Sequence, residues 1–172
     1  MCAAISAQAA DLKFDPDKFE TRSIKAGEKE VKFRAYEGIV YVAKPVDSRF
    51  QRLNFYVPAR YFEDKKDETG KFDTSSAPIF LPNSIGGYMP GEPFTPALGK
   101  PNAVLTALER GYVVAAPGAR GRSSKDANGK FSGKAPAAIV DLKAAVRYLK
   151  FNDATMAGDA NKIISNGTSA GG

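Results

Sequence analysis

The sequence contains no histidine and only one cysteine, Cys2, among its 172 residues. A lone cysteine cannot form an internal disulfide, and without a Cys/His cluster neither a zinc site nor another metal site is expected. The absence of histidine also removes the most common general base of serine and cysteine hydrolases from this stretch of chain. A membrane-spanning hydrophobic run, an internal repeat and a low-complexity tract are absent as well.

The composition is that of a globular chain, with 43% hydrophobic and 26% charged residues, which excludes a collagen-like or intrinsically disordered class. The net charge of +6 raises the question of a polyanionic partner. The basic residues gather between positions 117 and 134, where Phe131 is the only aromatic residue and no series for base stacking exists. No nucleic-acid partner is therefore expected.

The two ends of the chain suggest processing and truncation. Residues 1–10 read MCAAISAQAA, and Ala7-Gln8-Ala9 has the A-x-A form of a signal-peptidase site. We expect a signal-peptide remnant at 1–10 before a domain at 11–172, which favours a periplasmic or secreted protein over a cytoplasmic one. The alternative is a frayed N-terminus in a cytoplasmic protein. The chain stops at Gly172 directly after a Gly-rich turn, so we expect a fragment.

The first third of the chain predicts an antiparallel meander. Val31, Phe33 and Ala35 alternate with polar or half-polar neighbours, the period of a half-buried strand. Glu37-Gly38 predicts a turn, residues 39–43 a second strand, and residues 53–57 a third strand that Pro58 ends. Residues 63–76 predict a solvated polar loop.

From Ala77 onward, short apolar strands alternate with helices, which predicts parallel βαβ units. The helix near Pro136 has apolar residues at Ile139, Leu142, Val146 and Leu149, on one helical face. The Gly- and Pro-rich loop at 82–101 follows the first of these strands, at the edge where open α/β sheets place their sites. The expected strands are 79–81, 112–116 and 162–166, and the expected helices are 102–110 and the one beginning near Pro136.

Residues 167–171 form a G-x-S-x-G sequence directly after an apolar strand. In a nucleophile elbow the serine lies in a strained strand-to-helix turn, and small neighbours allow the backbones to approach. The sequence therefore predicts Ser169 as a catalytic nucleophile. The oxyanion of its tetrahedral intermediate needs two N–H donors. Ala170 is expected to supply one, and Gly87, with Gly86 as the alternative, the other.

Five segments together resemble the N-terminal part of bacterial tannases, which are feruloyl-esterase-like members of the α/β-hydrolase superfamily. The likeness runs from about Leu12 to the last residue. The segments are PNSIGGYMPG at 82–91, RGYVV at 110–114, GARGR at 118–122, IVDLKAAVRY at 139–148 and NGTSAGG at 166–172.

This resemblance implies an α/β-hydrolase fold: antiparallel lead-in strands, then parallel βαβ units, truncated at the nucleophile elbow. It implies a serine esterase that hydrolyses galloyl esters through an acyl-enzyme on Ser169, with Gly87 and Ala170 in the oxyanion hole and no cofactor. The expected partner is a small ester substrate, and the acid, the histidine and the galloyl-binding residues would lie in a missing C-terminal half. The chain alone is then expected to be inactive.

Two other functions stay open. A feruloyl or general carboxylesterase would use the same nucleophile on another acyl group. A non-catalytic binding protein with an α/β-hydrolase-like fold would account for the lack of histidine.

Overall fold

The computed structural model describes residues 11–26, 29–63, 70–97 and 102–172. The remnant expected at residues 1–10 lies outside the described residues, as do parts of the loops at 63–76 and 82–101. The strands are β1 (Glu20–Ala26), β2 (Lys29–Val40), β3 (Arg52–Pro58), β4 (Pro78–Pro82), β5 (Val113–Pro117) and β6 (Asp159–Asn166). The helices are α1 (Arg60–Glu63), α2 (Ala103–Glu109), α3 (Ala137–Phe151) and a 3-10 turn, η1 (Ser169–Gly171).

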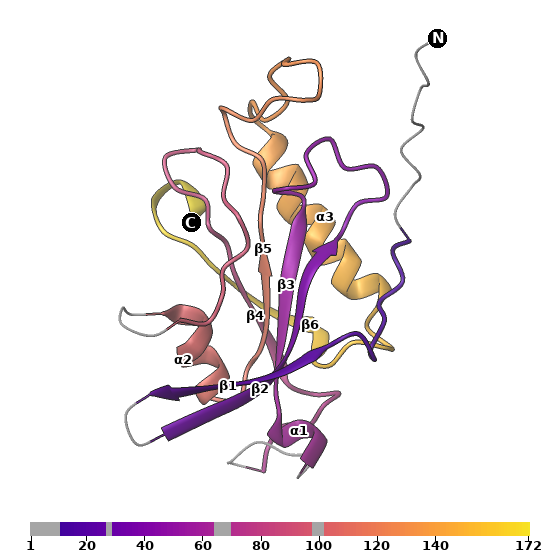
Figure 1. Ribbon diagram of the computed structural model, residues 1–172, viewed down its shortest axis with the longest axis vertical. Helices are drawn as coiled ribbons and strands as arrows, with labels where there is room; N and C mark the ends of the chain where they lie inside the picture. Colours follow the sequence, from indigo (N-terminus) through magenta and orange to yellow (C-terminus); the bar gives the residue numbers. More distant parts are fainter. Residues whose placement is uncertain (1–10, 27–28, 64–69, 98–101) are drawn as a thin grey trace.

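The strands form one mixed sheet in the order β1-β2-β3-β5-β4-β6 (Figure 1). Strand β2 pairs antiparallel with β1 on one side and with β3 on the other, and β3 pairs antiparallel with β5. Strand β4 pairs parallel with β5 on one side and with β6 on the other. The predicted α/β fold, with antiparallel lead-in strands followed by parallel βαβ units, is confirmed.

The turn expected at Glu37-Gly38 is wrong, because β2 runs through these residues as a β-bulge. Tyr36 pairs with Phe55 and Ile39 with Leu53, so two residues of β2 face one residue of β3. Gly38 has a φ of +72°, which glycine adopts without a steric penalty. Of the strand expected at residues 39–43, only the first two residues belong to β2, and the meander gains β1, which the sequence analysis missed.

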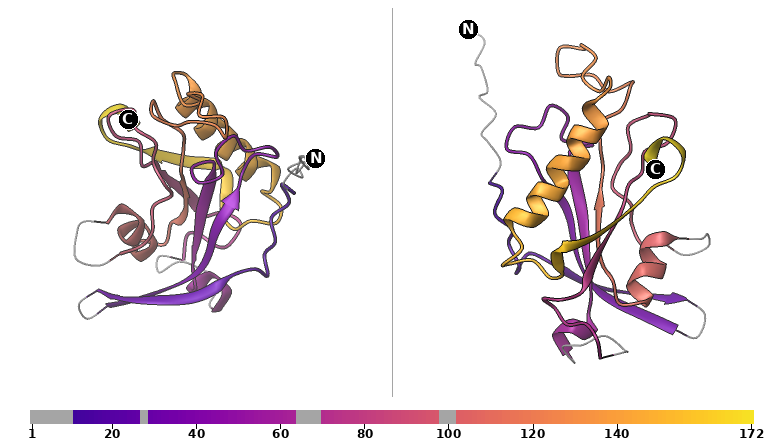
Figure 2. Two further views of the ribbon diagram at one scale, coloured as in Figure 1. Left: turned by 45° about the horizontal axis from the view of Figure 1, so that its top comes forward. Right: turned by 180° about the vertical axis from the view of Figure 1, so that it is seen from behind.

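The sheet separates two hydrophobic cores, one beneath α2 and one beneath α3. Figure 2 shows these two helices on opposite sides of the sheet. The α2 core packs Val104 and Leu108 against Phe33 and Tyr56, whereas the α3 core packs Tyr148 and Leu149 into the opposite face. Burial on both faces explains why β5 reads as a continuous apolar run.

The ends of the two longer helices agree with the sequence signals. Asn102 caps α2, since its Oδ1 accepts a hydrogen bond from the N–H of Leu105 at 3.0 Å. Helix α3 begins directly after Pro136. Helix α1, a single turn between β3 and the polar loop, carried no sequence signal.

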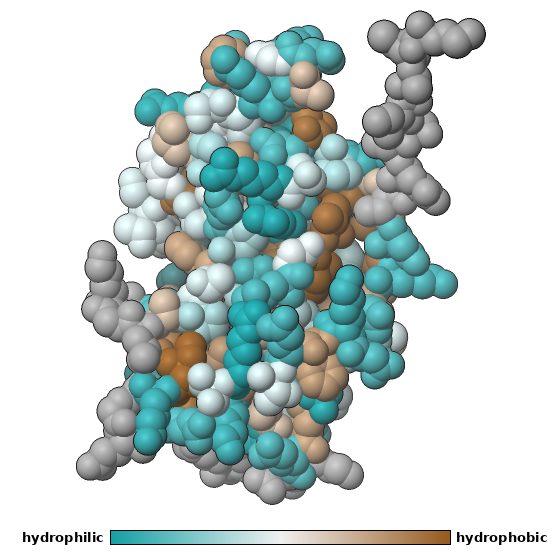
Figure 3. All heavy atoms as spheres, in the orientation of Figure 1, coloured by the Kyte–Doolittle hydropathy of each residue, from teal (hydrophilic) through white to brown (hydrophobic). Residues whose placement is uncertain are grey.

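The face of the molecule seen in Figure 3 is mostly hydrophilic, with hydrophobic side chains in separate small groups. Exposed ion pairs join residues of neighbouring strands, as between Arg22 of β1 and Glu37 of β2 at 2.9 Å.

The loops that follow β4, β5 and β6 lie together at one end of the sheet (Figure 1).

Candidate active site

Ser169 lies in a strained turn directly after β6. Its φ of +57° is in the left-handed region that non-glycine residues rarely adopt. Residues Gly167 and Thr168 connect the strand to the 3-10 turn, in which the N–H of Gly171 donates to the carbonyl of Thr168 at 3.0 Å. A strained serine between a strand and a helical turn is the arrangement that the sequence analysis expects of a nucleophile elbow, and residues 167–171 are called the elbow below.

The two glycines of the G-x-S-x-G sequence lie where no side chain fits. A Cβ atom at Gly167 would lie 1.8 Å from the carbonyl oxygen of Gly171. A Cβ atom at Gly171 would lie 2.6 Å from the carbonyl oxygen of Ile85. Close approach, not a positive φ, therefore requires glycine at both positions, and the second contact places the loop after β4 against the elbow.

Gly87 and Tyr88 form the tip of that loop as a tight turn. Both have positive φ values, +56° and +58°, and the N–H of Met89 donates to the carbonyl of Gly86 at 2.9 Å. Positive φ at both central residues is the feature of a type I′ turn. Glycine adopts it freely, whereas Tyr88 adopts it at a cost and leaves its ring exposed.

The loop after β5 supports this turn from behind. The N–H of Arg122 donates to the carbonyl of Tyr88 at 2.7 Å, and Gly91 and Ala119 exchange two backbone hydrogen bonds. Gly121 packs so closely on Met89 that a Cβ atom there would lie 2.2 Å from its carbonyl carbon. The position of the turn after β4 thus depends on the loop after β5.

That supporting loop is fixed to α3 by a buried ion pair. The carboxylate of Asp141, 1% exposed, accepts from the Nε and the backbone N–H of Arg120, both at 2.9 Å. Gln51 donates to the same carboxylate at 2.8 Å. The hydrogen bond to Asp141 raises the pKa of Arg120, so this guanidinium stays charged.

An apolar cavity of about 480 Å³ lies beside the elbow. Tyr88 and Ile85 line it from the loop after β4, Ala170 from the elbow, and Ile139 and Leu142 from α3. The structure thus brings Ala170 and the residue next to Gly87 to one cavity. Gly87 itself does not line it.

The backbone N–H groups of Gly87 and Ala170 donate no hydrogen bond within the described part of the chain. The hydroxyl of Ser169 likewise has no partner among residues 11–26, 29–63, 70–97 and 102–172. The chain itself holds no imidazole that would deprotonate Ser169.

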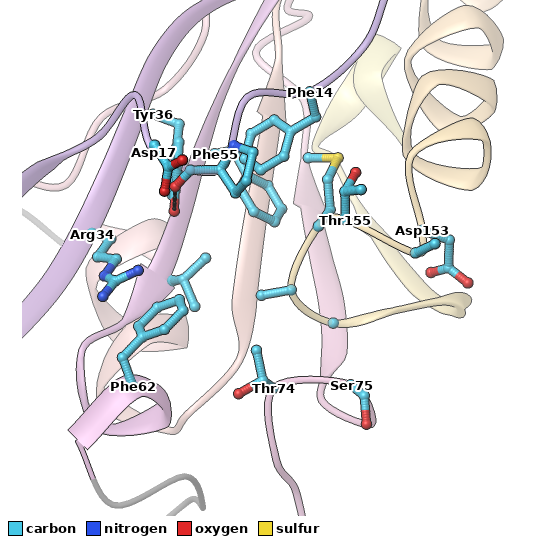
Figure 4. A pocket seen from close by; sticks show the side chains of 16 residues that line it. Phe14, Asp17, Arg34, Tyr36, Phe55, Phe62, Thr74, Ser75, Asp153 and Thr155 are labelled. Atoms are coloured by element: carbon cyan, nitrogen blue, oxygen red, sulfur yellow. Dashed lines mark hydrogen bonds between the residues drawn. The ribbon is translucent and has the colours of Figure 1, made fainter.

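A second pocket, of about 450 Å³, lies at the other end of the sheet (Figure 4). Its aromatic wall contains Phe14, Tyr36 and Phe55, and the guanidinium carbon of Arg34 lies 3.5 Å from the ring centre of Phe62. The hydroxyl of Tyr36 donates to the carbonyl of Pro16. Since this pocket lies near the amino ends of β4 and β6, it is separate from the elbow.

Two general properties of the described residues bear on the class of site. No helix among them is both long and apolar enough to cross a membrane. No three of their Asp, Glu, Cys and His side chains are grouped as a metal ion would require.

A mixed sheet whose parallel strands end in a serine elbow and a glycine turn defines the class of α/β-hydrolase-like proteins. Residues 78–172 match the BD-FAE family, and the chain belongs to this family. No curated protein matches the chain.

Solved tannases resemble the chain over most of its length. A tannase from Fusobacterium nucleatum is 57% identical with a TM-score of 0.90, over 94% of this chain and 34% of that one. A tannin acyl hydrolase in complex with 3,4-dihydroxybenzoate is 42% identical, with a TM-score of 0.86 and coverages of 93% and 36%. Another, in complex with ethyl gallate, is 42% identical with a TM-score of 0.84 and the same coverages. The chain spans about a third of the length of these tannases.

Sequence reasoning missed one residue of the candidate site, Asn83. It follows β4 directly, is 8% exposed, and bonds to the elbow at Gly171 and to the loop after β4 at Ile85. The available signal was an amide side chain at the carboxyl end of a parallel strand, just before a glycine pair.

Proposed function

We propose that the chain is the N-terminal part of a serine carboxylester hydrolase that cleaves galloyl esters. Ser169 is the nucleophile, and the N–H groups of Gly87 and Ala170 form the oxyanion hole. The observation that carries this proposal is the left-handed conformation of Ser169, at +57°, in a turn that lies against the glycine loop after β4. Strain of this kind is retained where surrounding structure enforces it, and it gathers at functional sites.

The reaction proceeds by acyl transfer. The Oγ atom of Ser169 attacks the ester carbonyl carbon while its proton passes to a histidine outside this chain. The carbonyl oxygen becomes an oxyanion that accepts hydrogen bonds from Gly87 and Ala170. The bond to the alcohol oxygen then breaks, and the alcohol leaves with the proton held by the histidine. Water attacks the acyl carbon and gives a proton to the histidine, the bond to the Oγ of Ser169 breaks, and the Oγ takes the proton back.

The substrate class rests on the relatives. One solved tannin acyl hydrolase holds ethyl gallate and another holds 3,4-dihydroxybenzoate, both phenolic molecules.

The 172-residue chain contains no histidine that could act as the base of the triad. We expect its turnover of p-nitrophenyl acetate to be lower than that of an intact triad by about 10⁴–10⁶-fold. Turnover by the purified chain that Ser169→Ala abolishes would contradict this.

The deciding experiment assays a full-length form against methyl gallate, methyl ferulate and p-nitrophenyl acetate, with Ser169→Ala as the control. We expect preference for methyl gallate and loss of nearly all turnover in the variant. Preference for ferulate or acetate would assign another esterase. Inactivity on all three esters in a folded protein would favour the binding-protein alternative, for which the absence of histidine is the supporting observation.

A further inference from the structure

Asn83 joins the two segments that carry the proposed oxyanion donors. Its Nδ2 donates to the carbonyl of Gly171 at 2.7 Å and to the carbonyl of Asn166 at 3.1 Å. Its Oδ1 accepts from the N–H of Ile85 at 3.3 Å. One nearly buried amide therefore bonds to the backbone before Ser169, to the backbone after it, and to the loop that leads to Gly87.

The chemistry of these three bonds fits an amide and not the other side chains of its size. The carbonyl of Gly171 needs a donor and the N–H of Ile85 needs an acceptor, and an amide supplies both. Its second N–H adds a bond to the carbonyl of Asn166, which also accepts from the backbone N–H of Asn83 at 2.9 Å. An aspartate has the same shape, but as a carboxylate it would present an oxygen to both carbonyls. A leucine would leave the carbonyl of Gly171 and the N–H of Ile85 without partners, whereas the carbonyl of Asn166 would keep the backbone N–H of residue 83.

The glycines of the elbow leave room for this amide. A Cβ atom at Gly171 would lie 2.5 Å from the Oδ1 of Asn83, and one at Gly167 would lie 2.7 Å from its Nδ2. Part of the requirement for glycine on either side of Ser169 thus comes from the side chain of Asn83. The amide and the elbow form one packed unit.

We infer that Asn83 is a positioning residue that sets the separation of the two halves of the oxyanion hole. Gly87 and Ala170 belong to segments that come from different strands, and the oxyanion needs both N–H groups at hydrogen-bond distance at once. The Asn83 amide holds the start of one segment against the end of the other. This inference rests on the proposed function of Ser169.

The test compares Asn83→Asp with Asn152→Asp in the full-length form. Asn152 is a matched control: it is 5% exposed, its Nδ2 donates to the carbonyls of Leu12 and Tyr148, and its Oδ1 accepts from the N–H of Phe14. It lies at the C-terminal end of α3, away from the elbow. Each variant replaces a buried amide that donates to two backbone carbonyls and accepts from one backbone N–H, but only Asn83 lies at the elbow.

We expect Asn83→Asp to lower kcat for methyl gallate by about 10²-fold, with KM changed less than about threefold. The affinity of a boronic acid, which forms a tetrahedral adduct on serine, should fall much more than that of 3,4-dihydroxybenzoate. Asn152→Asp should leave kcat and both affinities within about twofold. If Asn83→Asp does not fold, Asn83→Ala removes the amide without placing a carboxylate beside two carbonyls and is measured in the same way.

Equal kinetics for the Asn83 and Asn152 variants, or equal losses of boronate and dihydroxybenzoate affinity, would overturn the positioning role. Failure of the proposed function gives a different result, since Ser169→Ala would then retain the wild-type turnover. The two failures are thus distinguishable.

Discussion

Arg120 and Asp141 form an ion pair in which the guanidinium Nη2 lies 2.8 Å from the carboxylate Oδ1, with only 12% and 1% of the two side chains exposed. Asp141→Asn removes the charge and leaves a largely buried cation without its counter-ion. We expect the free energy of unfolding of the full-length form to fall by about 3–5 kcal/mol in urea denaturation. Glu30→Gln, which breaks the exposed pair with Lys32, is the control and should cost less than about 1 kcal/mol.

The left-handed conformation of Ser169 predicts that Ser169→Gly raises stability while removing activity. The strain costs about 1–2 kcal/mol, and the greater freedom of glycine in the unfolded chain offsets about 0.5–1 kcal/mol of the relief. Unfolding of Ser169→Gly should therefore require about 0.5–1 kcal/mol more than that of Ser169→Ala. The control is Ser23 in β1, where the glycine variant should unfold more easily than the alanine variant. A Ser169→Gly variant less stable than Ser169→Ala would rule out strain at the elbow.

Gly171→Ala places a methyl group against Asn83 and Ile85, so we expect kcat to fall by at least about tenfold. The control is Gly129→Ala. A Cβ atom at Gly129 meets nothing within 4 Å, so this variant has no steric clash, but the φ of +76° strains the backbone of any residue other than glycine. That control should lose about 0.5–1 kcal/mol of stability, since the strain of about 1–2 kcal/mol is partly offset by the lower freedom of alanine in the unfolded chain, and it should keep its kcat. An unchanged kcat in Gly171→Ala would contradict the close packing of the elbow.

Asp73 gives a prediction for acid conditions. Hydrogen bonds from the hydroxyls of Ser76 and Ser75 and from their backbone N–H groups lower its pKa to about 2. Because the folded pKa lies below the unfolded value of about 3.9, the charged side chain stabilises the fold above pH 4, and this contribution is lost as pH falls towards 2.

The difference in Tm between the wild type and Asp73→Asn should therefore be constant between pH 5 and 7 and shrink from about pH 4 to about pH 2. Thermal melts across this range measure it. In a Ser76→Ala background the difference at pH 6 should already be smaller, and a difference that grows with acid would refute the assignment.

The sequence predicted the parallel half of the sheet more fully than the antiparallel half. Strands β4 and β5 are short apolar runs, and β6 contains the apolar pair Ile163-Ile164. The bounds of all three agree with the expected ones to within a few residues. In β2 the pair Glu37-Gly38 has the composition of a turn, but the pairing of Tyr36 and Ile39 with β3 continues the strand across it. Tertiary pairing outweighs local turn preference there.

The candidate site was predictable where a local motif defines it. The G-x-S-x-G sequence predicts a strained turn, and Ser169 has the positive φ that such a turn requires. The role of Asn83 has no local signature, because its partners Asn166 and Gly171 are more than eighty residues away. Only the parallel pairing of β4 with β6 brings them together.

The bond between Asn83 and Asn166 also orders events during synthesis. The two residues are 83 positions apart, which at ribosomal rates of about 5–20 residues per second corresponds to roughly 4–17 s. During this interval β4 cannot pair with β6, and β5 becomes available only once residues 113–117 have been made. A nascent chain therefore exposes the loop after β4 before it exposes Ser169, the proposed nucleophile.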